Sequence, residues 1–249
     1  MNIMEEVTVI LNGYNRPHCL KLQLESLKQS TIPPASILLW QNFPSKEIQI
    51  ESAVLNSTNY VISNKNWGVW ARFFFAFNAT TKWICILDDD TIPGSRWIEN
   101  CLNTQRTNPG LLGTVGLTFP AGSQDYTNFT RYGWAEINNI APIEVDFVGQ
   151  GWFFRKDWLE YFAKELPDFS EYSLCGEDMH FSYVLRKYAS IPTYVPPHPI
   201  SDKTLWGSID GWNHGTKDAL CDTPGQWPRM RTYFKELRKR GWKLISEIN

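Results

Sequence analysis

The segment that most constrains the fold of this chain is WICILDDDTIP, residues 83–93. Residues 83–87 form an unbroken apolar run of strand length, which is typical of a strand buried on both faces of a sheet. Three aspartates, residues 88–90, follow directly, and a proline and a glycine then turn the chain away. The segment therefore predicts an α/β sheet covered by helices, with three carboxylates at the end of one inner strand.

Three adjacent carboxylates repel one another, so water, a basic partner or a divalent cation must offset the cost of burying them. Mg²⁺ and Mn²⁺ prefer oxygen ligands and typically combine one or two carboxylates with water and phosphate. Ligands of α/β sheets bind at the carboxyl ends of strands, where these aspartates lie. A polar exit from the strand is the alternative, because Asp is common in turns.

Composition excludes several classes of protein. The 249 residues are 43% hydrophobic and 20% charged, which is typical of a globular chain. The net charge of −2 argues against nucleic acid as the main partner. The five scattered cysteines, without a C-x-x-C pair, argue against a disulfide framework and a zinc site. The chain shows neither a signal peptide nor a membrane span, so we expect a cytoplasmic protein.

Strands and helices alternate in the first part of the chain. Leu20, Leu24 and Leu27 recur at helical spacing between two apolar runs of strand length. This order predicts parallel strands joined by right-handed crossovers, as in a nucleotide-binding half. Neither a G-x-G-x-x-G nor a P-loop motif occurs. We expect strands at 7–11, 36–40, 59–63 and 83–87, and a helix at 69–79.

The second part is expected to complete the same domain. We divide the chain into a nucleotide-binding half, residues 1–94, and a second half, residues 95–249. The Gly-rich and aromatic-rich stretch 120–139 predicts a loop over the site. The tail 229–248 predicts a basic helix with a solvated face, for which contact with a membrane surface is a minor alternative. We expect strands at 111–119, 143–154 and 191–195, an exposed helix at 95–108, and helices at 157–166 and 179–188.

Four motifs in order resemble the glycosyltransferases of the GT-A fold, nearest to family 2 and with some similarity to the exostosin-like family. The resemblance implies a Rossmann-like, mostly parallel sheet flanked by helices, with a C-terminal acceptor-binding part. The chain departs from the usual D-x-D motif by having three aspartates, which leaves the metal ligand open between them. The motifs are VTVILNGYNRP, NKNWGVWARFFFAFNATTKWICILDDDTIP, GQGWFFRKDWL and GEDMHFSYVLRKY.

The resemblance implies transfer of a sugar from a nucleotide diphosphate sugar, with a UDP-sugar favoured, assisted by Mn²⁺ or Mg²⁺. Asp90 would ligate the metal, and Asp88 would bind ribose or a metal-bound water. His198 would be the third metal ligand, with His214 as the weaker candidate. The expected contacts to base, ribose and diphosphate are Asn12, Tyr14, Arg16, Asn42, Asn66, Arg72, Asp88 and Asp89.

An inverting transferase needs a carboxylate base for the acceptor hydroxyl. Asp178 is the first candidate and Glu177 the second. We expect the helix N-terminus to lower the pKa of Asp178, although capping alone would also explain this acidic pair. The acceptor sugar is expected to lie on Trp134, Gly151 and Trp152.

Three alternatives remain open from the sequence. A retaining transferase of the exostosin-like type would use Asp178 to orient substrate rather than as a base. A sugar nucleotidyltransferase would share the first half of the fold, although its usual Gly-rich N-terminal loop matches NGYNRP poorly. A sugar-binding module without catalysis is the third, and the intact Asp88, Asp90 and Asp178 argue against it.

Overall fold

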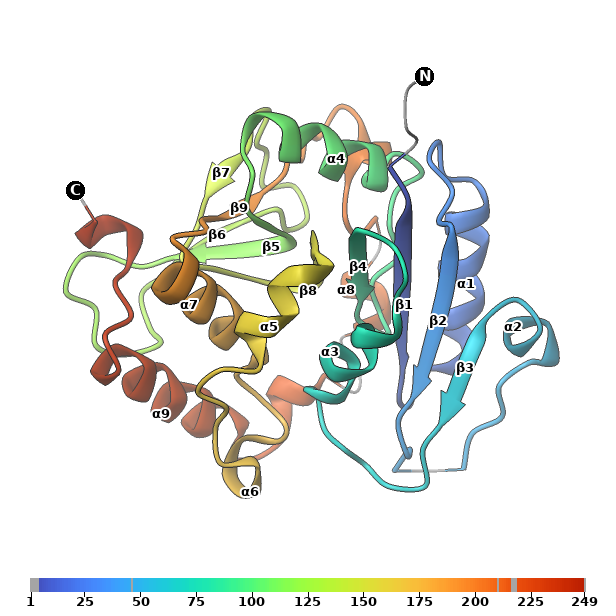
Figure 1. Ribbon diagram of the computed structural model, residues 1–249, viewed down its shortest axis with the longest axis horizontal. Coiled ribbons are helices and arrows are strands. Elements are labelled where there is room, and N and C mark those ends of the chain that lie inside the picture. Colours follow the sequence, from blue (N-terminus) through green and yellow to red (C-terminus); the bar gives the residue numbers. More distant parts are fainter. Residues whose placement is uncertain (1–4, 46, 210, 216–218, 249) are drawn as a thin grey trace.

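A single mixed sheet runs through the computed structural model, which describes residues 5–45, 47–209, 211–215 and 219–248 (Figure 1). In the described residues the strand order is β3-β2-β1-β4-β8-β5-β9-β7, with β6 paired to β5. The strands are β1 (Val7–Gly13), β2 (Ser36–Gln41), β3 (Asn59–Ile62), β4 (Trp83–Leu87), β5 (Leu111–Thr118), β6 (Thr130–Tyr132), β7 (Ile143–Glu144), β8 (Phe147–Arg155) and β9 (Thr193–Val195).

The first four strands in this order are parallel, as the βαβ pattern predicts. β1 pairs with β2 from Thr8 opposite Ser36, and with β4 from Val7 opposite Trp83. β8 then lies antiparallel to both β4 and β5, which makes the sheet mixed. The α/β class with a central sheet is therefore confirmed, but the sheet is parallel only from β3 to β4 and mixed beyond, rather than mostly parallel throughout.

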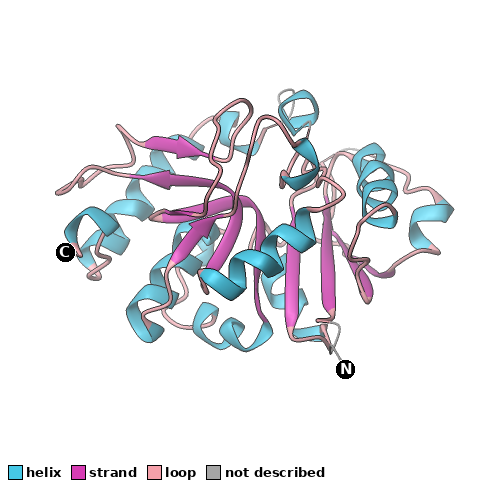
Figure 2. Ribbon diagram, turned by 90° about the horizontal axis from the view of Figure 1, so that it is seen from above, coloured by secondary structure: helices cyan, strands magenta, loops and turns pink. Residues whose placement is uncertain are grey.

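Helices cover both faces of the sheet (Figure 2). α1 and α4 pack on one face, and α3, α5, α7 and α9 pack on the other. The helices are α1 (Pro17–Lys28), α2 (Ser52–Leu55), α3 (Ala71–Phe75), α4 (Trp97–Thr107), α5 (Leu159–Phe162), α6 (Phe169–Tyr172), α7 (Glu177–Ala189), α8 (Gly211–Gly215) and α9 (Gln226–Lys239).

Side-chain alternation along β4 explains why both layers are needed. Trp83, Cys85 and Leu87 join the apolar cluster beneath α1 and α4, whereas Ile84 and Ile86 join the cluster beneath α3, α5 and α7. All five residues are buried, as the apolar run predicts. Burying a side chain of this size contributes about 1.5–3 kcal/mol. The strand that carries the aspartates is thus held firmly from both sides.

Four elements differ from the expectation. The helix expected at 157–166 is only the short α5, which follows a 3-10 turn. The helix expected at 69–79 is shorter, because α3 passes into a 3-10 turn after Phe75. The helix expected to be exposed at 95–108 is mostly buried, since α4 packs Trp97, Ile98 and Cys101 into the core. The strand expected at 143–154 is two strands, β7 and β8.

The basic C-terminal helix is tied to the protein by ion pairs. Arg231 pairs with Asp125, and Arg238 pairs with Glu247. These pairs use charges that a membrane surface would otherwise attract. Among the described residues, no helix combines the length and apolar character needed to cross a membrane.

Candidate active site

The aspartate run lies at the carboxyl end of β4, and two arginines form close ion pairs with two of its three carboxylates. Arg16 donates to Asp89 at 2.6 Å, and Arg72 Nη1 lies 2.9 Å from Asp88 Oδ1. The nearest arginine contact of Asp90 is longer, at 3.5 Å from Arg16 Nη1. Asp90 is therefore the member of the run with the weakest ion pair.

Arg72 also connects the run to the acidic pair that opens α7. Its Nη2 lies 2.8 Å from Glu177 Oε1, and both side chains are buried. Its guanidinium carbon sits 4.8 Å from the centre of the Trp152 ring, which holds it in place. Asp178, next in the chain, has no ion-pair partner in the part of the chain that the structure describes, and its carboxylate accepts a hydrogen bond from the Met179 amide at 2.7 Å.

Burial raises the pKa of each of these carboxyl groups. For Asp178, desolvation is the largest cause, and the negative charge of Asp88 adds to it. The expectation of a lowered pKa is wrong, because burial outweighs the favourable amide of the helix terminus. Burial and the neighbouring Asp89 likewise raise the pKa of Asp90. A site that raises the pKa of several carboxyl groups at once favours a bound cation or proton transfer.

The Gly149-Gln150-Gly151 segment of β8 forms the wall beside Asp178. A Cβ added to Gly149 would lie 3.5 Å from Asp178 Oδ2. The carbonyl of Gln150 accepts hydrogen bonds from the Asp88 amide at 3.0 Å and the Thr91 hydroxyl at 2.7 Å. Gln150 itself has a φ of 65°, in the left-handed region. The central part of β8 thus joins the aspartate run to the acidic pair of α7.

His214 reaches the same region from α8. Gly215, the next residue, lies against Asp90, because a Cβ added there would sit 2.5 Å from Asp90 Oδ2. Arg16 Nη2 donates to the Gly215 carbonyl at 3.2 Å and so fixes this segment to the aspartate run. The weaker of the two histidine candidates is therefore the one whose neighbour in the chain, Gly215, lies against Asp90.

The family is decided by a comparison of the sequence with known families. The sequence model described as glycosyl transferase family 2 matches residues 8–162, more than half of the 249 residues. The chain belongs to glycosyltransferase family 2. The match includes the aspartate run and the glycine-rich part of β8, and it ends before α7 and His214. A comparison with the curated proteins found no match.

Solved glycosyltransferase structures share the fold of this family 2 chain. TarS 1–349 of S. aureus in complex with UDP matches with a TM-score of 0.54 and 14% identity, covering 77% of this chain and 58% of that one. The mannosyltransferase PcManGT of Pyrobaculum calidifontis, in complex with GDP-Man and Mn²⁺, matches with a TM-score of 0.53 and 16% identity, covering 79% and 56%. This chain spans less than two thirds of the length of each of these two proteins. The similarity confirms the expected GT-A fold.

His198, the first candidate for the third metal ligand, packs against residues of the core in this family 2 chain. Its Nε2 lies 2.9 Å from the carbonyl of Ala135, and its ring stacks on Trp206 with 4.0 Å between the ring centres. Its backbone pairs with Asn139. Among the described residues, none of these contacts is with the aspartate run. The carbonyl can only accept, so Nε2 carries a proton and is not free to bind a metal.

The predicted donor contacts gather at the carboxyl ends of β1 and β2. Asn42 is buried and donates to Asn66 Oδ1 at 2.8 Å and to the Gly68 carbonyl at 3.1 Å. Its own Oδ1 accepts from the Trp67 amide at 2.9 Å. The side chain of Asn42 is thus used to hold the loop after β3, whereas Asn12, Tyr14 and Asn66 remain partly or fully exposed beside it.

Two predicted acceptor residues are buried and do not form a platform. Trp152 is 1% exposed and donates its indole N–H to the Val148 carbonyl at 3.1 Å. Gly151 is buried against Thr114, whose Oγ1 would lie 2.6 Å from an added Cβ. Trp134 is partly exposed, with the Arg131 guanidinium carbon 5.5 Å from its ring centre. The glycine-aromatic motif therefore builds the core and the wall of the site rather than a sugar platform.

Trp227 is an exposed aromatic residue that sequence reasoning missed. Its ring is 41% exposed and lies 5.7 Å from that of Tyr126, whose pKa is raised by burial and by the charge of Asp178. The buried Gln226 beside it donates to the Leu174 carbonyl at 2.9 Å, just before the acidic pair. The signal in the sequence is weak, because Trp227 is one of 12 tryptophans.

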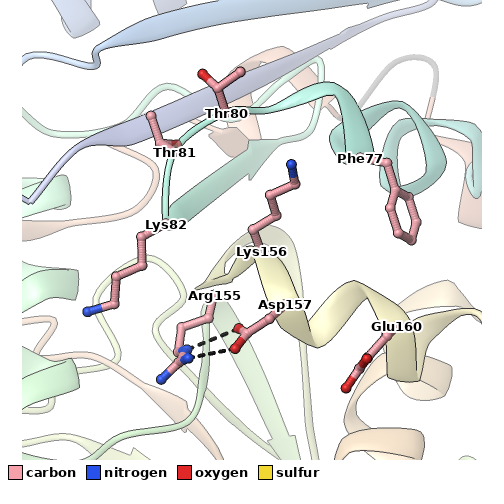
Figure 3. Close-up of a pocket in the computed structure, with 8 residues that line it drawn as sticks. All are labelled: Phe77, Thr80, Thr81, Lys82, Arg155, Lys156, Asp157 and Glu160. Atoms are coloured by element: carbon pink, nitrogen blue, oxygen red, sulfur yellow. Dashed lines mark hydrogen bonds and ion pairs between the residues drawn. The ribbon is translucent and has the colours of Figure 1, made fainter.

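Two further cavities lie away from the aspartates. One of about 510 Å³ is lined by Lys82, Arg155 and Glu160, among others, at the amino end of β4 (Figure 3). There Arg155 is paired with Asp157, as Figure 3 shows. The other, of about 550 Å³, is aromatic and includes Trp67 and Phe74. Neither is lined by a carboxylate of the aspartate run.

Proposed function

We propose that this family 2 glycosyltransferase moves a sugar from a nucleotide diphosphate sugar, with UDP as the favoured nucleotide, to a glycan hydroxyl with inversion. The arrangement of Arg72 carries the proposal. It pairs with Asp88 and Glu177 and leaves Asp178 as the carboxylate without a cation partner beside the aspartate run. The similarity in fold to structures that contain UDP-GlcNAc, or GDP-Man with Mn²⁺, supports a nucleotide-sugar donor.

The residues around Asp90 fit a divalent cation. Asp90 has only a long contact to Arg16, and burial and nearby charge raise its pKa. Gly215, the residue after His214, lies against Asp90. We propose Asp90 and His214 as ligands, with Asp88 near the ribose or a metal-bound water. When bound, Mn²⁺ or Mg²⁺ would stabilise the charge that develops on the leaving diphosphate.

The protein's own groups supply the remaining steps. Asp178 accepts the proton of the acceptor hydroxyl, and a pKa raised by burial makes it a better base than an exposed carboxylate. Arg16 and Arg72 hold Asp89 and Asp88 in place through their ion pairs, and their positive charges oppose the rise in pKa that burial causes. The loop held by Asn42 positions Asn66 toward the nucleotide.

The acceptor is proposed to approach from the side of β8 and α9. Gly149 leaves Asp178 open on this side, since a side chain there would contact the carboxylate. Trp134 and Trp227 are the exposed aromatic candidates for stacking on a sugar ring. We do not assign α9 to a membrane surface, because Arg231 pairs with Asp125 and Arg238 pairs with Glu247.

Turnover of UDP-sugars with Mn²⁺ tests the proposal, with simple sugars as acceptors and release of UDP as the signal. The Asp178→Asn variant should lose transfer, whereas Asp157→Asn, an exposed control, should keep it. Nuclear magnetic resonance of the product should show an inverted anomeric configuration. Retention would remove Asp178 as the base, and pyrophosphate-dependent formation of UTP would indicate a nucleotidyltransferase. Absence of turnover with every donor would favour a sugar-binding module.

A further inference from the structure

Three metal-ligating side chains lie together beside the aspartate run. The ligand atoms of His18, Cys19 and His214 are all within 4.8 Å of one another. The first two belong to the first turn of α1, and the third belongs to α8. His18 and Cys19 have no role in the proposed transfer, so this cluster needs an account of its own.

Arg16 fixes the two chain segments that form the cluster. It precedes His18 by two residues, and its guanidinium donates both to Asp89 at 2.6 Å and to the Gly215 carbonyl at 3.2 Å. The start of α1 and the end of α8 are therefore held at the same side of the aspartate run. Cys19 is fully buried, whereas His18 is exposed and His214 is partly exposed. The thiol is thus held in the core, whereas both histidines reach solvent.

We propose that His18, Cys19 and His214 form a binding site for a borderline-soft divalent cation such as Zn²⁺, and that a cation bound there inhibits transfer. Two imidazoles and a thiolate are a ligand set that Zn²⁺ prefers and that Mg²⁺ does not. A tetrahedral zinc ion requires its ligand atoms to lie roughly 3.5 Å apart. The three atoms lie within 4.8 Å of one another, so the histidines would have to turn toward the ion when it binds. The Cys19 thiol releases its proton to solvent when the metal binds.

The inhibitory effect follows from the position of His214. The proposed catalytic metal also uses this residue, and Gly215 beside it lies against Asp90. An ion held by His18, Cys19 and His214 would occupy the imidazole that the proposed catalytic metal needs, and it would place a second positive charge close to the first. Binding of the soft cation stands independently of the proposed function, whereas inhibition rests on it.

Titration of the purified full chain with Co²⁺ tests the site itself, because thiolate ligation gives cobalt an intense charge-transfer absorption. The wild type should show this band, and Cys19→Ser should lose it. His18→Ala changes an exposed residue, so it should fold normally and bind Co²⁺ at least tenfold more weakly. Cys221→Ser is the matched control, because Cys221 is the partly exposed cysteine outside the cluster. A band that survives in Cys19→Ser, or unchanged affinity in His18→Ala, would overturn the proposal.

Inhibition of transfer by Zn²⁺ at saturating Mn²⁺ is the second test. The concentration that halves the rate should rise at least tenfold in His18→Ala and stay unchanged in Cys221→Ser. Equal inhibition of all three proteins would overturn the inhibitory role. If the wild type transfers no sugar but the Co²⁺ band appears as described, the metal site stands and the proposed function fails.

Discussion

Arg72 Nη2 lies 2.8 Å from Glu177 Oε1, and this buried ion pair connects α3 to the start of α7. The other nitrogen of the same guanidinium reaches Asp88 at 2.9 Å. One arginine therefore pairs with two carboxylates of the site and joins three segments of the chain. Asp178 is adjacent to the pair but outside it, which distinguishes a structural carboxylate from one available to accept a proton.

The two residues of the acidic pair should respond differently to the loss of charge. Asp178→Asn should lower the rate of transfer by about 10²–10⁴-fold, because it removes the general base. Its melting temperature should stay close to that of the wild type, since no ion pair is broken. Glu177→Gln should instead lower the melting temperature, because Arg72 loses a buried partner. Steady-state rates and thermal unfolding of both variants check this, and equal rate losses with equal stability would contradict the division of roles.

Removing Arg72 should be costly. Arg72→Ala leaves the buried Glu177 and the partly exposed Asp88 without their cation, and loss of a buried ion-pair partner typically costs about 3–5 kcal/mol of the free energy of unfolding. Arg96→Ala is the matched control, because Arg96 pairs with Glu99 and Asp202 at the surface. Its loss should cost at most about 1 kcal/mol. Urea unfolding of the two variants measures the difference, and similar costs would refute the structural role of Arg72.

Substitutions at two glycines should distinguish the cost of crowding from the cost of backbone strain. Gly68 and Gly122 have φ values of 72° and 76°, but an added Cβ would lie 1.8 Å from the Ser173 carbonyl oxygen at Gly68 and within 4 Å of nothing at Gly122. Gly122→Ala should therefore cost only the left-handed strain, about 1–2 kcal/mol. Gly68→Ala should cost about 3 kcal/mol or more, because crowding adds to the strain. Equal losses in urea unfolding would show that the loop after β3 is not packed as described.

His180 should make stability depend on pH. Burial lowers its pKa from 6.5 to about 4, and its ring lies 2.9 Å from the Phe162 carbonyl and 3.0 Å from the Tyr233 hydroxyl. Between these pH values the unfolded chain binds a proton that the folded chain does not, so stability falls as the pH drops from 6.5 to 4. The loss from this residue alone is about 3 kcal/mol at most.

His180→Phe isolates this contribution, because it removes the titrating group from both states. The stability of the variant should fall less steeply than that of the wild type over the same pH range, whatever its absolute stability. Urea unfolding at several pH values measures both slopes. Parallel curves would show that His180 becomes protonated in the folded protein as readily as in the unfolded chain.

The sequence predicted the main strands and the first helix of residues 1–94 well because their signals are local. The apolar run 83–87 and the Leu20, Leu24 and Leu27 spacing report directly on burial, and both elements are confirmed. The antiparallel insertion of β8 between β4 and β5 was not expected. It arises from long-range pairing between segments far apart in the chain, which local propensity does not report.

The site predictions that differ from the structure also depend on contacts between segments far apart in the chain. His198 and His214 look alike in sequence, and only their surroundings tell them apart: Trp206 stacks on His198, whereas Gly215, next to His214, lies against Asp90. The raised pKa of Asp178 depends on burial, which a helix-terminus argument does not include. The His18 and Cys19 cluster was missed because its third member is about 195 residues away, whereas motif searches expect ligands at short spacing.

The metal-dependent binding of the nucleotide is the central claim, and calorimetric titration of UDP with and without Mn²⁺ tests it most directly. GDP should be titrated alongside, with the wild type and the Asp90→Ala variant compared under both conditions. We predict that UDP binds the wild type tightly only with Mn²⁺, and that Asp90→Ala abolishes this dependence. Binding of equal strength without metal and in the variant would contradict the account, because the aspartate run would then not hold the metal.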